Sequence, residues 1–216
     1  VIATKDFPAE EFLMFATAQG NVKKTSMDQY DRTRRDGLIA INLKDGDELI
    51  SVKRVAKGEK VIMVSSAGKA ILWDESEARA MGRGTMGVRG MNVPADAHVL
   101  GMEIAKPGTD LFVITEKGYG KRTKIEEYPE HHRGGQGVYT ITMTHKKGLL
   151  SVMKIVGPDD EIMIVSEDGV IVRTPVKGIS ELGRSTQGVK VMNVADKDKV
   201  CAVAIASTGK KKAKKA

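Results

Sequence analysis

Cysteine, aromatic residues and long apolar runs are all scarce in this sequence of 216 residues. The single cysteine, Cys201, cannot form an internal disulfide, which favours a reducing, intracellular setting. Because its neighbours in KVCAVAIA are small and apolar, we expect Cys201 to lie in the core. Aromatic residues make up only 4% of the chain, which argues against a protein that stacks nucleic-acid bases on aromatic side chains.

No apolar run approaches the roughly 20 residues that a membrane-spanning helix needs. The first residues, VIATKDFPAEEF, have neither the basic start nor the apolar centre of a signal peptide, and they include no initiator Met. We therefore expect a cytoplasmic protein with no membrane partner, and we interpret the chain as a processed or excised piece.

An internal repeat organises the rest of the sequence. An apolar run ending in a glycine turn occurs four times, and each turn is followed by a short polar strand and a loop that closes on a second glycine. The turn glycines are Gly20, Gly68, Gly118 and Gly169, spaced by 48, 50 and 51 residues. The closing glycines are Gly37, Gly87, Gly137 and Gly188, spaced by 50, 50 and 51 residues.

The repeat predicts an all-β fold. Its segments are short, rich in Val and Ile, and bounded by Gly, Asp and Asn, and the apolar runs suit strands buried on both faces. Four strands in each unit of about 50 residues are typical of a propeller blade, with a solenoid as the alternative. We expect one β-pinwheel or propeller-like domain of four-stranded antiparallel blades at residues 1–208, with repeats at about 1–55, 56–105, 106–156 and 157–208.

Isolated hairpins are marginally stable, so a strand from each repeat is expected to cross into the neighbouring blade. Helix is nearly absent from the pattern, and residues 74–81 are the best candidate for a turn or two. Residues 209–216 hold five lysines and are expected to be a disordered tail, either a solubilising extension or a nonspecific arm for nucleic acid.

The loop before each closing glycine carries an arginine, which a purely structural corner does not require. These are Arg34, Arg83, Arg133 and Arg184. The loop and polar strand of the four repeats (residues 20–37, 68–90, 118–137 and 169–190) contain 17 Lys or Arg against 10 Asp or Glu. The rest of the chain before the tail contains 13 against 18, so we expect one basic and one acidic side to each unit.

A polyanion with recurring phosphates fits such a row of corners. Arginine binds phosphate bidentately, and glycine lets backbone N–H groups come close to it. Duplex DNA on the row would have to bend, at a cost on the order of 1–6 kcal/mol for a 20–30 base-pair site, offset by counterion release. A metal site at His131 and His132 is disfavoured, because the only cysteine is far away in the sequence and the other three loops have no histidine.

The motifs NVKKT, MGRGTMGVRGMNV, GYGKRT, RGGQGV and GRSTQGVKVMN closely resemble the C-terminal domain of the A subunit of bacterial DNA gyrase, a type II topoisomerase. The resemblance covers nearly the whole chain except the lysine tail. It implies a β-pinwheel whose basic rim wraps DNA and thereby supports negative supercoiling. It also implies partners in the gyrase A N-terminal region and gyrase B, in an A2B2 holoenzyme, and a nucleoid-associated location.

Two features depart from that family. The family usually has five or six blades, and four are visible here, which implies that the missing units precede Val1. Its signature box, Q-R-R-G-G-R/K-G, is matched best by residues 131–137, where histidines and a glutamine replace three of the usual residues. Together with the charge pattern, the resemblance suggests that the following residues contact DNA: Lys23, Lys24, Arg34, Arg35, Arg83, Arg89, Lys121, Arg122, Arg133, Gly134, Gly135, Gln136, Gly137, Arg173, Arg184 and Lys190.

Other functions remain open at this point. The matching C-terminal domain of topoisomerase IV is a close alternative, and a propeller-like protein-interaction scaffold is a more distant one. We expect the chain to be noncatalytic, monomeric and without a cofactor. No nucleotide-binding glycine loop precedes a helix, and the tyrosines are interpreted as packing or rim residues.

Overall fold

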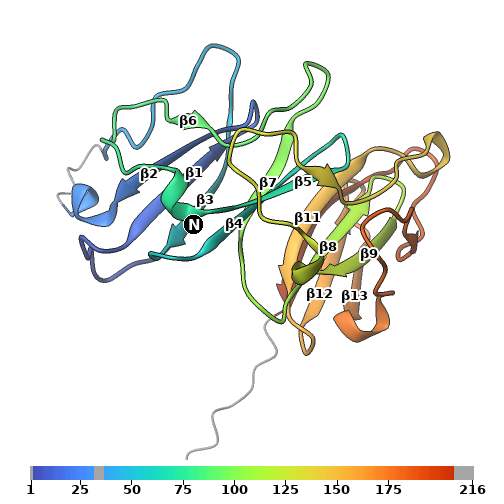
Figure 1. Ribbon diagram of the computed structural model, residues 1–216. Helices are drawn as coiled ribbons and strands as arrows, with labels where there is room; N and C mark the ends of the chain where they lie inside the picture. The colour runs from blue at the N-terminus through green and yellow to red at the C-terminus, as the bar shows by residue number, and fades with distance from the viewer. Residues whose placement is uncertain (1, 32–36, 207–216) are drawn as a thin grey trace, which may run out of the picture.

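The computed structural model describes residues 2–31 and 37–206, and these build four antiparallel sheets arranged in an arc (Figure 1). Each repeat contributes a long apolar strand, the polar strand that follows its glycine turn, and a third long strand from the next hairpin. The strands are β1 (Phe12–Thr17), β2 (Asn21–Ser26), β3 (Leu49–Val55), β4 (Lys60–Ser65), β5 (Lys69–Asp74), β6 (Val88–Arg89), β7 (Val99–Ala105), β8 (Asp110–Thr115), β9 (Tyr119–Lys124), β10 (Val138–Tyr139), β11 (Leu150–Val156), β12 (Glu161–Ser166), β13 (Ile171–Pro175), β14 (Val189–Lys190) and β15 (Val200–Ala206).

Strand exchange between repeats completes the first three sheets, as the sequence predicts. Their orders are β3-β1-β2-β6, β7-β4-β5-β10 and β11-β8-β9-β14. The two-residue strands β6, β10 and β14 come from the following repeat and pair with the polar strand of the sheet before them. In Figure 1, β6 accordingly lies at the edge of the first sheet beside β2.

The fourth sheet corrects the expectation of four strands in every blade. Its order is β13-β12-β15, so three strands are present among the described residues. In the first three sheets the fourth strand is supplied by the repeat that follows. The all-β prediction is confirmed, and the segment with the best helical pattern forms only a 3-10 turn at Glu75–Glu77.

The long central strands are buried on both faces, as their continuous apolar runs predict. In β4, Val61 and Met63 face a core shared with the first sheet, whereas Ile62 and Val64 face a core shared with the third. β8 repeats this alternation, with Phe112 and Ile114 facing the fourth sheet. Side chains alternate across a strand, so each central strand links two cores.

The prediction that Cys201 is buried is wrong. It lies on β15 and is exposed. The third long strands β3, β7, β11 and β15 pack in a row. Among the described strands β15 is the last of that row and packs in it against β11, and its small apolar side chains reach solvent.

The glycine turns match the sequence prediction. Gly20, Gly68, Gly118 and Gly169 all adopt a positive φ. At Gly118 the space is restricted as well, because a Cβ there would lie 2.1 Å from the carbonyl oxygen of Met192 in the next repeat. None of the helices among the described residues is long and apolar enough to cross a membrane.

We predict that Gly118→Ala destabilises the fold more than Gly108→Ala does. Both positions have a positive φ, near +79° and +74°, but a Cβ at Gly108 meets no atom within 4 Å. The left-handed backbone costs alanine roughly 1–2 kcal/mol at either site. Overlap with Met192 adds about 1–3 kcal/mol at Gly118 only.

Urea unfolding of the two variants measures the difference. Equal free energies of unfolding would mean that the close approach between the third and fourth repeats contributes nothing.

Candidate nucleic-acid interface

The described corner loops, those of the second, third and fourth repeats, are each hydrogen-bonded to the segment that follows the preceding corner, so they lie in series along one edge of the molecule. The amide of Asn42 donates to the carbonyl of Thr85 at 3.2 Å, which joins the first repeat to the second corner. The amide of Asn92 donates to Gly135 at 2.9 Å and that of Thr142 to Thr186 at 3.0 Å, which joins the second to the third and the third to the fourth.

Lys121 fastens the fourth corner and does not reach solvent. Its Nζ donates to the carbonyls of Gly183 and Arg184, at 2.6 and 2.8 Å, and to Oγ1 of Thr186 at 2.9 Å. The side chain is buried on β9. Loss of hydration lowers the pKa of Lys121 to about 8, so the ammonium is still mostly protonated at neutral pH.

Lys23 does the same for the second corner. Its Nζ donates to the carbonyls of Ala40 and Arg83, and burial, followed by the nearby charge of Arg83, lowers its pKa to about 8. The expectation that Lys23 and Lys121 contact DNA is therefore corrected: their charges hold the loops that carry Arg83 and Arg184. A charge buried in this way needs carbonyl oxygens around it, and these corners provide them.

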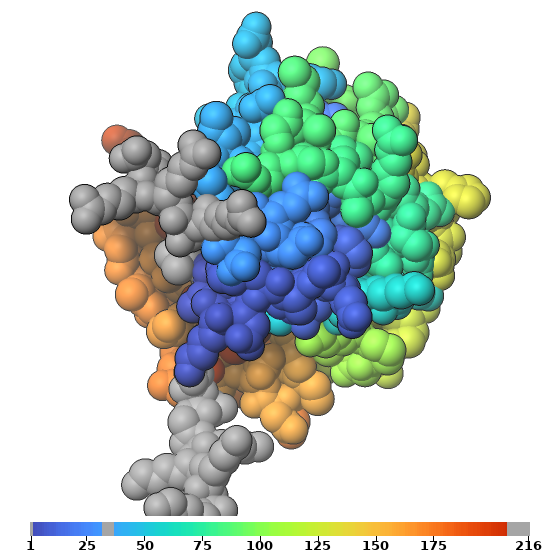
Figure 2. All heavy atoms as spheres, turned by 90° about the vertical axis from the view of Figure 1, so that its left-hand side faces the viewer, coloured from blue at the N-terminus to red at the C-terminus, as the bar shows by residue number. Residues whose placement is uncertain are grey.

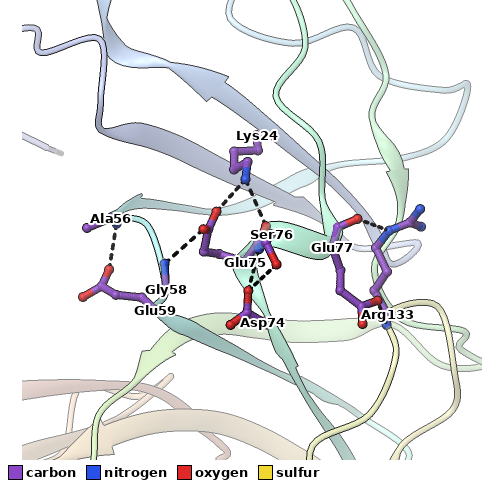
Figure 3. A network of polar contacts seen from close by, with 9 residues as sticks. All are labelled: Lys24, Ala56, Gly58, Glu59, Asp74, Glu75, Ser76, Glu77 and Arg133. Carbon is purple, nitrogen blue, oxygen red and sulfur yellow. Dashed lines mark hydrogen bonds and ion pairs between the residues drawn. The ribbon is translucent and has the colours of Figure 1, made fainter.

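Three further predicted residues on the polar strands are paired with carboxylates. Buried Lys24 donates to the Glu75 carboxylate, and Figure 3 shows this pair between the first and second repeats. Arg122 pairs with Asp110 and, at 2.7 Å, with Glu181 of the next repeat. Arg173 pairs with Glu161. The expectation of direct DNA contact is corrected for Lys24, because its burial in an ion pair leaves no face for phosphate.

The third corner is organised by Glu77 of the second repeat. One carboxylate oxygen accepts the backbone N–H of Arg133 at 3.0 Å, and the other lies 2.6 Å from Nδ1 of His132. The Arg133 N–H is the main cause of the lowered pKa of Glu77. Arg133 in turn donates Nε to the Glu77 carbonyl at 2.8 Å (Figure 3). Its Nη1 donates to the carbonyl of Arg89 at 2.9 Å.

The crowded stretch around His131 and His132 is therefore a braced corner. Gly134 donates its N–H to the carbonyl of Gly90 at 2.7 Å, and Gln136 accepts from Lys69 at 2.9 Å. In the described part of the chain, no group of three or more His, Cys, Asp or Glu residues is placed to hold a metal ion.

Several cationic side chains at the corners make few hydrogen bonds or ion pairs within the protein. Among the described residues, the guanidinium groups of Arg89 and Arg184 have no hydrogen bond or ion pair. Arg83 has one long contact, 3.4 Å from Nη1 to the carbonyl of Ile39. Exposed Lys190 on β14 lies 4.2 Å from the ring of Tyr119. Arg34 and Arg35 lie outside the described residues.

Sequence reasoning missed Lys147, which belongs to the same group. Its Nζ donates to the carbonyl of Gly188 at 3.1 Å and lies 5.0 Å from the centre of the Tyr119 ring, which Lys190 also contacts. The residue sits in the polar turn of the third repeat, outside the stretches whose charge was counted. A polar turn recurs several residues after each closing glycine, and in the third repeat its adjacent lysines, Lys146 and Lys147, were the signal that could have pointed to it.

Comparison with known proteins fits this architecture. The family model described as the DNA gyrase C-terminal domain, beta-propeller, matches residues 11–56, 59–106, 109–146 and 160–207. The chain belongs to the DNA gyrase C-terminal domain family. Each of the four matches to this family corresponds to one strand-exchanging repeat.

Individual relatives agree. The DNA gyrase A protein of Mycobacterium tuberculosis (strain ATCC 25618 / H37Rv) is 37% identical over 206 residues, which cover 94% of this chain and 25% of the relative. A solved gyrase A C-terminal domain is 31% identical, with a TM-score of 0.83 over 94% of this chain and 68% of that one. The solved C-terminal domain of DNA topoisomerase IV is 25% identical, with a TM-score of 0.89 over 95% and 64%. The chain thus spans about a quarter of the length of the curated relative.

We predict that Lys121→Met lowers stability, although it adds an apolar side chain to a buried site. The substitution leaves the part-buried carbonyls of Gly183 and Arg184 without their charged donor, and each hydrogen bond to a charged group contributes about 1.5–3 kcal/mol. The matched control is Lys146→Met, because Lys146 is exposed. This substitution should change the free energy of unfolding by less than about 0.5 kcal/mol.

Thermal or urea unfolding of the two variants provides the comparison. A Lys121→Met protein as stable as the parent would show that the ammonium does not fasten the corner.

Proposed function

We propose that this chain is a noncatalytic module that binds and wraps duplex DNA without sequence specificity. The observation that carries the proposal is the series of hydrogen-bonded corners of the second, third and fourth repeats, beside which the described cations Arg83, Arg89 and Arg184 lie. Arg83, Arg89, Arg184 and Lys190 are the described members of the predicted set whose charges are least committed elsewhere. Membership in the gyrase C-terminal domain family supports the same conclusion.

The geometry explains how such an edge would act on DNA. Each corner offers a positive charge and glycine-rich backbone to phosphate, and neither group reads the identity of a base. Because the sheets follow one another in an arc, DNA that contacts all the corners must curve with them (Figure 1). Release of counterions from several phosphates would offset the bending cost of roughly 1–6 kcal/mol.

The curated relatives are gyrase A proteins by name, and this suggests the setting in which the module works. We propose that it supports ATP-dependent negative supercoiling by a type II topoisomerase, in an A2B2 assembly with the gyrase A N-terminal region and gyrase B. A cytoplasmic, nucleoid-associated location and a single domain at residues 1–208 follow from the same reasoning. The role of residues 209–216 as a disordered tail lies outside the described residues.

The topoisomerase IV alternative has one observation in its favour, the higher TM-score of its C-terminal domain. Sequence identity favours gyrase, at 31% against 25% for the two solved domains. Backbone shape is shared by both enzymes, whereas identity includes the loop residues that would touch DNA. Gyrase is therefore the better-supported setting.

We predict that DNA affinity falls steeply with salt and that single corner substitutions reduce the steepness. The logarithm of the binding constant should fall with log salt by about 0.9 for each phosphate neutralised. Arg89→Ala or Arg184→Ala should lower the slope by about 1 and weaken binding equally on unrelated DNA sequences.

The control is Arg54→Ala on β3, where Arg54 is exposed but paired with Glu11 away from the corners. Fluorescence anisotropy with two duplexes at several salt concentrations gives all of these values. A flat salt response would favour a protein-interaction scaffold, and sequence-selective loss would contradict phosphate binding.

We predict that the bound chain also imposes a curvature of constant handedness. A circular plasmid relaxed in its presence, then stripped of protein, should retain supercoils of one sign in proportion to the amount of chain added. A variant carrying Arg83→Ala, Arg184→Ala and Lys190→Ala should leave the plasmid relaxed. If the plasmid carried no supercoils even at saturating wild-type chain, wrapping would be ruled out, whereas the proposal that the chain binds DNA would stand.

A further inference from the structure

The ring of Tyr119 is contacted by the ammonium groups of two lysines from different repeats. Nζ of Lys190 lies 4.2 Å from the centre of the ring, and Nζ of Lys147 lies 5.0 Å from it. Lys147 belongs to the polar turn of the third repeat, whereas Lys190 lies on β14, the strand that the fourth repeat adds to the third sheet. An aromatic ring attracts a cation within about 6 Å of its centre, so Tyr119 gathers two charges at this third junction between repeats.

A backbone carbonyl holds each of these ammonium groups as well. Lys190 donates to the carbonyl of Lys117 in the glycine turn, at 3.2 Å, and Lys147 donates to the carbonyl of Gly188 at 3.1 Å. In the part of the chain that the structure describes, neither ammonium is paired with a carboxylate. An ammonium group has three N–H donors, so both lysines keep donors for an anion.

The polar turn of the third repeat differs from its counterparts in length and in charge. Leu150, the first residue of β11, is 13 positions after its closing glycine, whereas β3, β7 and β15 each begin 12 positions after theirs. The turn forms the 3-10 helix η4 (His145–Lys147). In the first and fourth repeats, Asp47 and Asp198 accept a backbone N–H of the glycine turn at 2.9 and 3.0 Å. The third repeat has Gly148 at that place, so lysine charge takes the position of carboxylate charge.

The contact between Lys190 and Tyr119 has a counterpart at the second junction, between the second and third repeats. Each is a cross-strand pair beside a turn glycine: Lys190 with Tyr119 on β14 and β9, and Tyr139 with Lys69 on β10 and β5. The strands have exchanged residue types, yet Nζ of Lys69 still lies 5.2 Å from the centre of the Tyr139 ring. Among the described residues, Tyr119 is the only tyrosine with a second lysine at its ring.

Two more lysines extend the positive charge around this ring. Lys117 in the glycine turn and Lys146 in the polar turn are both exposed. The two turns lie against each other, because a Cβ at Gly148 would lie 3.1 Å from Cγ of Lys117. The neighbouring carboxylate of Glu116 lies 3.5 Å from Nζ of Lys199. The third-junction patch consists of Lys117, Tyr119, Lys146, Lys147 and Lys190.

The third-junction patch borders the fourth corner and lies away from the first repeat. Lys147 donates to Gly188, which closes the corner loop of Arg184. Figure 2 looks at the end formed by the first repeat: its blue atoms face the viewer, green atoms of the second repeat lie beside them, and yellow atoms of the third repeat lie behind on the right. Substitutions in the patch therefore alter the edge at the third junction and leave the residues of the first repeat untouched.

We propose that the third-junction patch is a clamp for the DNA backbone, in which Tyr119 positions the ammonium groups of Lys147 and Lys190 to bind phosphate. This inference rests on the DNA-binding function proposed above. A free lysine is a flexible point charge that loses rotamer freedom when it binds phosphate. A lysine already held by a ring and a carbonyl loses less of that freedom, so the two held charges bind phosphate more tightly than free lysines would.

The test measures affinity for duplex DNA by fluorescence anisotropy at several salt concentrations. Tyr119→Leu removes the ring and keeps both lysines. It should weaken binding about two- to fivefold for each lysine, without changing the slope of log affinity against log salt. Tyr119→Phe should bind like wild type, because it keeps the ring.

The control for a merely structural role of the ring is a variant with Lys147→Gln and Lys190→Gln. Its salt slope should fall by about 2, and adding Tyr119→Leu to it should weaken binding no further. Tyr139→Leu should cost less affinity than Tyr119→Leu does, because its ring holds one lysine, Lys69, which also donates to Gln136 at 2.9 Å.

Proton NMR of the wild-type chain without DNA tests the contact independently of any substitution. The ring current of Tyr119 should shift the ε-methylene protons of Lys147 and Lys190 upfield. In Tyr119→Leu these signals should return to the positions of an unperturbed lysine.

Wild-type affinity in Tyr119→Leu, or an equal loss in the variant that lacks both lysines, would overturn the inference. Unshifted lysine signals in the wild-type chain would overturn it as well. A wild-type chain whose DNA binding did not depend on salt would overturn the proposed function together with this inference, so the two failures are distinguishable.

Discussion

The approach of one repeat's backbone to the glycine turn of its neighbour is the contact on which the rest of this structure depends. At the junctions, a two-residue strand closes the preceding sheet, and the residues after it donate amides to the turn glycine, as Gly90 and Met91 do to Gly20. Only glycine allows this, because any Cβ at Gly20 would overlap the Met91 carbonyl. Each repeat is therefore incomplete alone, and the cores between the sheets form only when neighbours exchange strands.

These junctions also determine where the basic side chains of the corner loops lie. Because each short strand follows its corner loop directly, closing a sheet also brings that loop beside the preceding repeat and puts the corners in one row. Buried lysines at two corners, Lys23 and Lys121, use their ammonium groups to hold loop carbonyls, which keeps Arg83 and Arg184 at the edge. The basic residues thus divide between those that build the row and those that it presents.

The sequence could not predict which basic residues hold the corner loops and which are exposed at the edge. A lysine on a polar strand is expected to be a surface residue, and the sequence NVKKT gives no sign that Lys23 donates to the carbonyl of Ala40 in its own repeat and to that of Arg83 in the next. Arg83 lies 60 residues from Lys23 and Arg184 lies 63 residues from Lys121, and only the exchange of strands brings these carbonyls within reach. Cys201 failed as a prediction for a similar reason, because burial of β15 depends on a neighbour on its second side.

The sequence by itself determined the strands, the glycine turns, the four-fold repetition and the recurrence of a basic corner, because these follow from local periodicity and from the steric freedom of glycine. It also carried the family resemblance, since the motifs at the corners are contiguous in the chain. Tertiary structure alone decided which cations are buried, paired or available. Burial and pairing depend on residues a full repeat away, and no local pattern records which of them will meet.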